Sequence, residues 1–132
     1  REPLDCHLWN AKLGRLLPQM SYAELQAPSA NGPLRAGSYL KRYGLAIVRN
    51  VPAELGMVAH VGSILGHVRE TNYGSVFDVI DLGSSGNNLA QTNCRIYSHT
   101  DNPYRDPFPG VQLLHCLANA TEGGATTFTD GF

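Results

Sequence analysis

The chain has 132 residues, 42% of them hydrophobic, which is enough for one domain with a modest core. Ten basic and eleven acidic residues give a net charge of -1, which argues against nucleic-acid or membrane-surface partners. The three cysteines form no CxxC pair, and the sequence has neither a signal-peptide pattern nor a run of about 18 apolar residues. These features favour a cytoplasmic protein.

Turn-forming and helix-capping residues predict two helices in the first third of the chain. Ser21, followed three residues later by Glu24, is a capping-box pattern and predicts a short helix that runs to about Gln26. The apolar spacing over 34–43, with Gly44 directly after it, predicts a second helix.

A third helix and four strands are expected further along the chain. The helix covers 53–66, and the strands cover 45–48, 73–80, 111–118 and 125–129. The run 111–118 is apolar on both faces, as in an inner strand of a packed sheet. Helices mixed with strands in this way predict an α+β fold.

Two potential metal ligands, His99 and Asp101, stand two positions apart. Because side chains alternate along an extended segment, this spacing can turn both toward the same side. Two histidines and one carboxylate form the open Fe(II) site of non-haem oxygenases, and the pattern shows two of these three ligands. Taken alone, His-x-Asp is more often a structural pair than a metal site. His115, between Leu114 and Cys116, is expected to be structural.

Several sequence blocks surround this pair. They are Asn-Tyr-Gly-Ser-Val-Phe-Asp-Val at 72–79, Asn-Asn-Leu-Ala at 87–90, His-Thr-Asp-Asn-Pro-Tyr-Arg at 99–105, Pro-Gly-Val-Gln-Leu-Leu-His-Cys at 109–116, Gly-Gly at 123–124 and Asp-Gly-Phe at 130–132. In order and spacing they resemble the γ-butyrobetaine dioxygenase family, a branch of the TauD/TfdA-like Fe(II)- and 2-oxoglutarate-dependent oxygenases. The resemblance covers most of residues 8–132, and several motifs in register are more specific than one.

The resemblance implies that 21–132, after an N-terminal segment over 1–20, is the N-terminal portion of an oxygenase domain. Such a domain has a double-stranded β-helix, or jelly-roll, core with flanking helices. The implied metal is Fe(II), held by His99, Asp101 and a second histidine downstream. The implied co-substrates are 2-oxoglutarate and dioxygen, and the resemblance allows a homodimer of the full-length protein.

The resemblance also assigns two residues to the co-substrate. Thr126 would donate a hydrogen bond to the distal carboxylate of 2-oxoglutarate, beside an arginine further downstream. An ordinary strand threonine explains Thr126 equally well. Asn88 matches an asparagine that lies near the substrate and the co-substrate in the family.

The implied reaction hydroxylates a small trimethylammonium substrate, such as γ-butyrobetaine or a relative, in carnitine biosynthesis. Tyr73 and Phe77 match two positions of an aromatic cage, whose ring faces attract a quaternary ammonium. Without the resemblance, core packing would be the better explanation of these two rings. A third cage position falls on Gln91, whose amide has no π face, and Asn102 follows the aspartate.

Residue 132 lies in the Asp-Gly-Phe block, before the family's second histidine ligand and 2-oxoglutarate arginine. The 132 residues alone are therefore expected to bind Fe(II) weakly and to be inactive. The alternative is a non-catalytic binding or interaction protein on the same scaffold, which a downstream histidine and arginine would argue against. A metal-dependent hydrolase ranks last, because neither a third ligand nor a water-activating base is in view.

Overall fold

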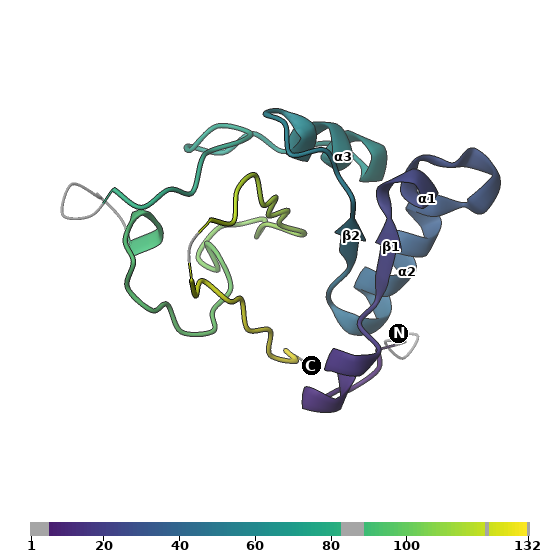
Figure 1. Ribbon diagram of the computed structural model, residues 1–132, viewed down its shortest axis with the longest axis horizontal. Coiled ribbons are helices and arrows are strands. Elements are labelled where there is room, and N and C mark those ends of the chain that lie inside the picture. Colours follow the sequence, from purple (N-terminus) through teal and green to yellow (C-terminus); the bar gives the residue numbers. More distant parts are fainter. Residues whose placement is uncertain (1–5, 83–88, 121, 132) are drawn as a thin grey trace.

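The computed structural model describes residues 6–82, 89–120 and 122–131. Nearly all of the regular structure in these ranges precedes residue 66 and forms one compact group, seen on the right of Figure 1. In chain order the elements are η1 (Ala11–Arg15), β1 (Gln19–Ser21), α1 (Tyr22–Gln26), η2 (Pro28–Ala30), α2 (Gly32–Tyr43), β2 (Ile47–Arg49), α3 (Met57–Leu65) and η4 (Leu89–Gln91). None of the described helices is long and apolar enough to cross a bilayer.

Strands β1 and β2 form a parallel pair, in which Met20 lies opposite Val48. Parallel neighbours need a crossover connection, and here α1 and α2 supply it. The strand predicted over 45–48 is confirmed with a shift of its bounds to Ile47–Arg49. Strand β1 covers the last two residues of segment 1–20 and Ser21. The apolar residues of that segment do not recur at a regular spacing, so their pattern does not indicate the type of element there.

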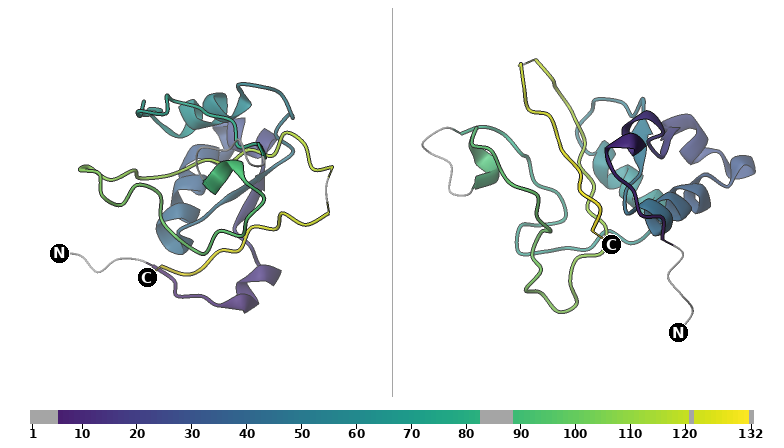
Figure 2. Two further views of the ribbon diagram at one scale, coloured as in Figure 1. Left: turned by 90° about the vertical axis from the view of Figure 1, so that its left-hand side faces the viewer. Right: turned by 90° about the horizontal axis from the view of Figure 1, so that it is seen from below.

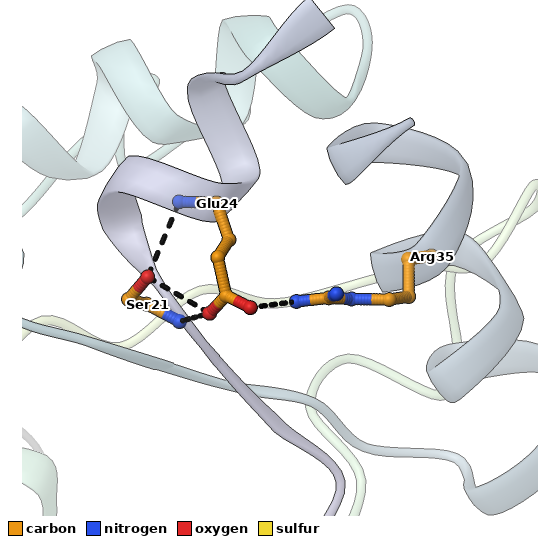
Figure 3. A network of polar contacts seen from close by, with 3 residues as sticks. All are labelled: Ser21, Glu24 and Arg35. Carbon is orange, nitrogen blue, oxygen red and sulfur yellow. Dashed lines mark hydrogen bonds and ion pairs between the residues drawn. The ribbon is translucent and has the colours of Figure 1, made fainter. Parts of the chain in front are cut away.

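Helix α1 begins at the predicted capping box, which the structure confirms. The Ser21 hydroxyl accepts from the Glu24 backbone N–H at 3.2 Å, and Glu24 Oε2 accepts from the Ser21 backbone N–H at 2.7 Å. Figure 3 shows that the same carboxylate also reaches Arg35 on α2. One side-chain network therefore caps α1 and joins it to the next helix.

The predicted second and third helices are both present. Helix α2 ends at Gly44, whose left-handed φ of 73° lets its N–H reach the Leu40 carbonyl at 2.9 Å. Helix α3 covers Met57–Leu65, which is shorter at its start than the predicted 53–66. Gly56, also left-handed at φ 86°, directly precedes it.

The hydrophobic core lies between the parallel strands and the helices. Its buried side chains are Met20, Leu25, Ala36 and Val61, of which Leu25 and Ala36 are fully buried. Leu113, from the second half of the chain, packs against this cluster. The two halves of the chain therefore share apolar contacts.

The strands predicted over 73–80, 111–118 and 125–129 are wrong for the described residues, where these stretches are extended or irregular. In these stretches several large apolar side chains that were expected inside are exposed, among them Leu114 at 71%. A strand exists only where a neighbouring strand accepts and donates its backbone hydrogen bonds, and β-propensity does not create that neighbour. The described part is thus a small mixed fold of helices with a two-stranded parallel sheet.

Figure 2 shows the second half as long loops that lie beside the compact group. In Figure 1 the C-terminal end of the chain returns to the N-terminal turn η1. A hydrogen bond between Trp9 and Asp130 fixes this return.

Candidate metal centre

His99 and Asp101 face each other at the surface of the second half of the chain. The distance from Nε2 of His99 to Oδ1 of Asp101 is 3.1 Å, and the side chains are 53% and 40% exposed. The backbone bends at Ser98 and at Asp101, and the two side chains turn toward each other across this short stretch. Both side chains are therefore partly exposed to solvent.

A backbone carbonyl orients the imidazole. Nδ1 of His99 lies 2.7 Å from the carbonyl oxygen of Tyr97. Because a carbonyl oxygen only accepts, Nδ1 carries the proton in this contact, and Nε2 is the nitrogen that faces Asp101. Histidines that bind metals commonly donate their other N–H to a backbone carbonyl in this way.

The donor set fits a divalent metal ion. Nε2 of His99 and Oδ1 of Asp101 lie 3.1 Å apart, so one ion could contact both atoms. One imidazole nitrogen and one carboxylate oxygen are also two of the three donors of a non-haem Fe(II) site. Within the described ranges no group of three or more His, Cys, Asp or Glu side chains gathers. The described residues thus bring together two of the three donor groups that such a site uses.

The segment 122–131 reaches the residue next to this pair. Ser98 Oγ and Thr129 Oγ1 share a hydrogen bond of 3.0 Å. Thr126, three positions before Thr129, is exposed, and among the described residues its hydroxyl has no hydrogen-bond partner. Sequence reasoning missed the contact between Ser98 and Thr129, because two exposed hydroxyl residues 31 positions apart carry no pattern that relates them.

Tyr73 and Phe77, the two predicted cage residues, lie together. Their ring centroids are 5.9 Å apart with the planes tilted by 44°. Both side chains remain about half exposed, so packing in a buried core does not describe them. The ring faces are accessible to a small cation.

The structure places the other predicted substrate and co-substrate residues in different settings. Gln91 is half-buried in η4, where its backbone carbonyl accepts from the Leu82 N–H at 2.8 Å. Asn102 adopts a left-handed φ of 47°, and its side-chain oxygen accepts from the Tyr104 hydroxyl at 2.8 Å. Asn88 lies outside the described residues.

Arg69 holds the loop that follows the metal pair. Its Nη1 donates to the carbonyl oxygens of Pro107 and Phe108, at 3.2 and 3.4 Å. A cavity of about 380 Å³ beside this loop includes Arg69 and Arg105 in its lining but neither His99 nor Asp101. His99 and Asp101 thus lie outside this cavity, with partly exposed side chains.

A histidine and a carboxylate are two of the three ligand types of a non-haem Fe(II) site, and the comparisons with known proteins add the context that this pair lacks by itself. Residues 8–132 match the taurine catabolism dioxygenase TauD, TfdA family, so the chain belongs to that family. This confirms the resemblance drawn from the sequence blocks.

Three relatives give finer comparisons. The γ-butyrobetaine dioxygenase of Pseudomonas sp. (strain AK-1) is 40% identical over 89 residues, which are 67% of this chain and 23% of the relative. The human γ-butyrobetaine dioxygenase is 30% identical over 97% of this chain and 32% of the relative. The mitochondrial trimethyllysine dioxygenase of Rattus norvegicus is 34% identical over 95% and 30%. The chain thus spans about a third or less of the length of these relatives.

Proposed function

We propose that the protein acts as an Fe(II)- and 2-oxoglutarate-dependent dioxygenase that hydroxylates a small trimethylammonium compound. The observation that carries the proposal is the pair His99 and Asp101, with Nε2 and Oδ1 turned toward each other and Nδ1 tied to a carbonyl. Relatives named γ-butyrobetaine dioxygenase and trimethyllysine dioxygenase support this substrate class. Either compound, or one related to them, would be the substrate.

In this proposal, separate residues hold the metal and the co-substrate. His99 and Asp101 would hold the metal, and the Tyr97 carbonyl would keep the imidazole in the required orientation. When bound, Fe(II) and 2-oxoglutarate supply the activation of dioxygen, with 2-oxoglutarate decarboxylated to succinate and one oxygen atom entering a substrate C–H bond. The free hydroxyl of Thr126 would donate to a carboxylate of 2-oxoglutarate.

The ring pair would position the substrate. A trimethylammonium group cannot donate a hydrogen bond, so it is recognised through the negative faces of aromatic rings. Tyr73 and Phe77 offer two such rings at 5.9 Å from each other. We further propose that 21–132 is the N-terminal portion of a jelly-roll core, in which further strands would pair with the extended segments.

Anaerobic titration of the full-length protein that contains residues 1–132, with Fe(II) and 2-oxoglutarate, tests the proposal. We expect the charge-transfer band of the chelated complex, followed in air by succinate release that depends on a trimethylammonium substrate. His99→Ala and Asp101→Ala should abolish both signals, whereas His67→Ala and Asp78→Ala, at exposed positions outside the pair, should not. Full activity of His99→Ala would overturn the proposal. If only residues 1–132 are used, we expect weak Fe(II) binding and no turnover.

A non-catalytic binding protein is the second candidate, and the accessible ring pair favours it. Tyr73 and Phe77 can attract a quaternary ammonium without any metal. Binding of γ-butyrobetaine or trimethyllysine without succinate release, unaffected by His99→Ala, would favour this candidate over the enzyme.

A further inference from the structure

The N-terminal segment and the segment 122–131 are joined by a hydrogen bond across 121 positions of the chain. The Trp9 backbone N–H donates to Oδ2 of Asp130 at 2.7 Å, in a partly buried contact. The Trp9 indole Nε1 in turn donates to the Tyr43 carbonyl, at the end of α2, at 2.9 Å. Asp130 is thereby anchored to the compact first half of the molecule.

The residue before Asp130 makes contact beside the metal pair. Thr129 Oγ1 and Ser98 Oγ share a hydrogen bond of 3.0 Å, and Ser98 directly precedes His99. Neither of these two segments belongs to a described strand, so no backbone ladder sets their relative position. Side-chain contacts such as these therefore help to set it.

We propose that Asp130 is a positioning residue for the metal pair. It accepts from Trp9 and so holds the segment 122–131 against the first half, and Thr129 then supports Ser98 and the short stretch that follows it up to Asp101. Metal affinity depends on groups that orient the ligands, because a bound ion tolerates little misplacement of its donors. The inference rests on the proposed function only in that His99 and Asp101 bind a metal.

Substitutions that remove or retain each contact test this inference in the full chain. Asp130→Leu removes the acceptor for Trp9, whereas Asp130→Asn keeps an amide oxygen at the same place. Thr129→Val removes the hydroxyl and Thr129→Ser keeps it. Thr127→Val is the matched control, since Thr127 is exposed in the same segment and has no hydrogen-bond partner among the described residues.

Co(II) is the probe, and its affinity is read from ligand-field absorption at a temperature where circular dichroism shows each variant folded. We expect Asp130→Leu and Thr129→Val to bind Co(II) more weakly by up to roughly tenfold, the lower end of the loss seen when a group bonded directly to a metal ligand is removed. Asp130→Asn, Thr129→Ser and Thr127→Val should bind as the unmodified protein does. A residue that only stabilises the fold would shift the melting temperature and leave the affinity of the folded protein unchanged.

His99→Ala distinguishes a failure of the proposed metal site from a failure of the positioning role of Asp130. If His99→Ala leaves Co(II) affinity unchanged, the metal site of the proposed function is wrong. If His99→Ala weakens binding but both Thr129→Val and a folded Asp130→Leu do not, the positioning role is wrong and the metal site stands. If Asp130→Leu does not fold, the Co(II) affinities of Thr129→Val and Thr129→Ser are compared instead. Equal affinities would then show that the positioning role is wrong.

Discussion

Arg35 on α2 donates from Nη2 to Oε1 of Glu24 on α1 across 2.8 Å. The contact joins the two helices that connect the parallel strands. The Glu24 carboxylate uses its other oxygen to close the capping box with Ser21. A single ionised side chain therefore serves both the start of α1 and its packing beside α2.

This arrangement predicts a dependence of stability on pH. Hydrogen bonds from the Ser21 backbone, and then from Arg35 and the Ser21 hydroxyl, lower the pKa of Glu24 from 4.5 to about 2. Because the pKa is lower in the folded state, the contribution of Glu24 is complete above pH about 4.5 and is lost as the pH falls through about 2. Melting temperatures of the unmodified protein and Glu24→Gln should therefore converge over this range.

Glu54→Gln is the control for that titration, because its carboxylate is exposed and lies outside this network. Its melting temperature should follow that of the unmodified protein at every pH. A difference between the unmodified protein and Glu24→Gln that stayed constant down to pH about 2 would contradict the assigned role of Glu24.

Two glycines of α2 should respond to alanine in opposite directions. A Cβ at Gly32 would collide with the backbone carbonyls of Glu24 and Leu25, so Gly32→Ala should cost about 1–3 kcal/mol of unfolding free energy. At Gly37 a Cβ meets nothing within 4 Å, and Gly37→Ala should stabilise by about 0.5–1 kcal/mol. Urea denaturation measures the change in unfolding free energy for both variants. Equal changes would argue against close packing of Gly32 on the backbone carbonyls of Glu24 and Leu25.

The core assignment makes a prediction at Leu25. This side chain is fully buried, so Leu25→Ala should lower the unfolding free energy by about 2–5 kcal/mol. Leu34→Ala, at a side chain that is 72% exposed on α2, should stay within about 0.5 kcal/mol of the unmodified protein. Comparable losses at both positions would show that Leu25 does not lie in the core.

The ring pair can be tested with a simple cation. Phe77→Ala should weaken the binding of tetramethylammonium by about 0.5–1 kcal/mol, the size of a cation–π contact at an exposed site. Phe108→Ala removes a ring that is 69% exposed and outside the pair, and it should leave the affinity unchanged. Chemical shifts in a titration followed by nuclear magnetic resonance report both affinities. If the two variants bind equally well, the cation is held elsewhere.

Local signals in the sequence predicted the first half of the fold well. The capping box at Ser21 and the glycine at the end of α2 act within one helical turn, so the sequence alone contains the whole cause. The run 111–118 is the opposite case. Its apolar residues predicted an inner strand, but pairing depends on a second segment that the run itself does not specify.

The candidate site also has one contact that the sequence predicted and another that it did not. The spacing of His99 and Asp101 predicted that their side chains can face each other, and they do, although the backbone bends at Ser98 and Asp101 instead of forming the expected extended segment. The support from Trp9 through Asp130 had no such signal. A backbone N–H donor is present at every residue except proline, so only the folded chain shows which one reaches the carboxylate.

Because secondary structure is concentrated in the first half of the chain, the two halves should differ in how often their backbone amides open to solvent. Helices and paired strands protect backbone amides up to residue 65, whereas few of the described residues after it donate a backbone hydrogen bond. Amide hydrogen exchange should therefore divide the chain into a slowly and a rapidly exchanging half. His99 and Asp101 belong to the rapidly exchanging half. A metal ion that binds both side chains would stabilise, by mass action, the conformation in which they lie together. It would therefore slow the exchange of the amides around them.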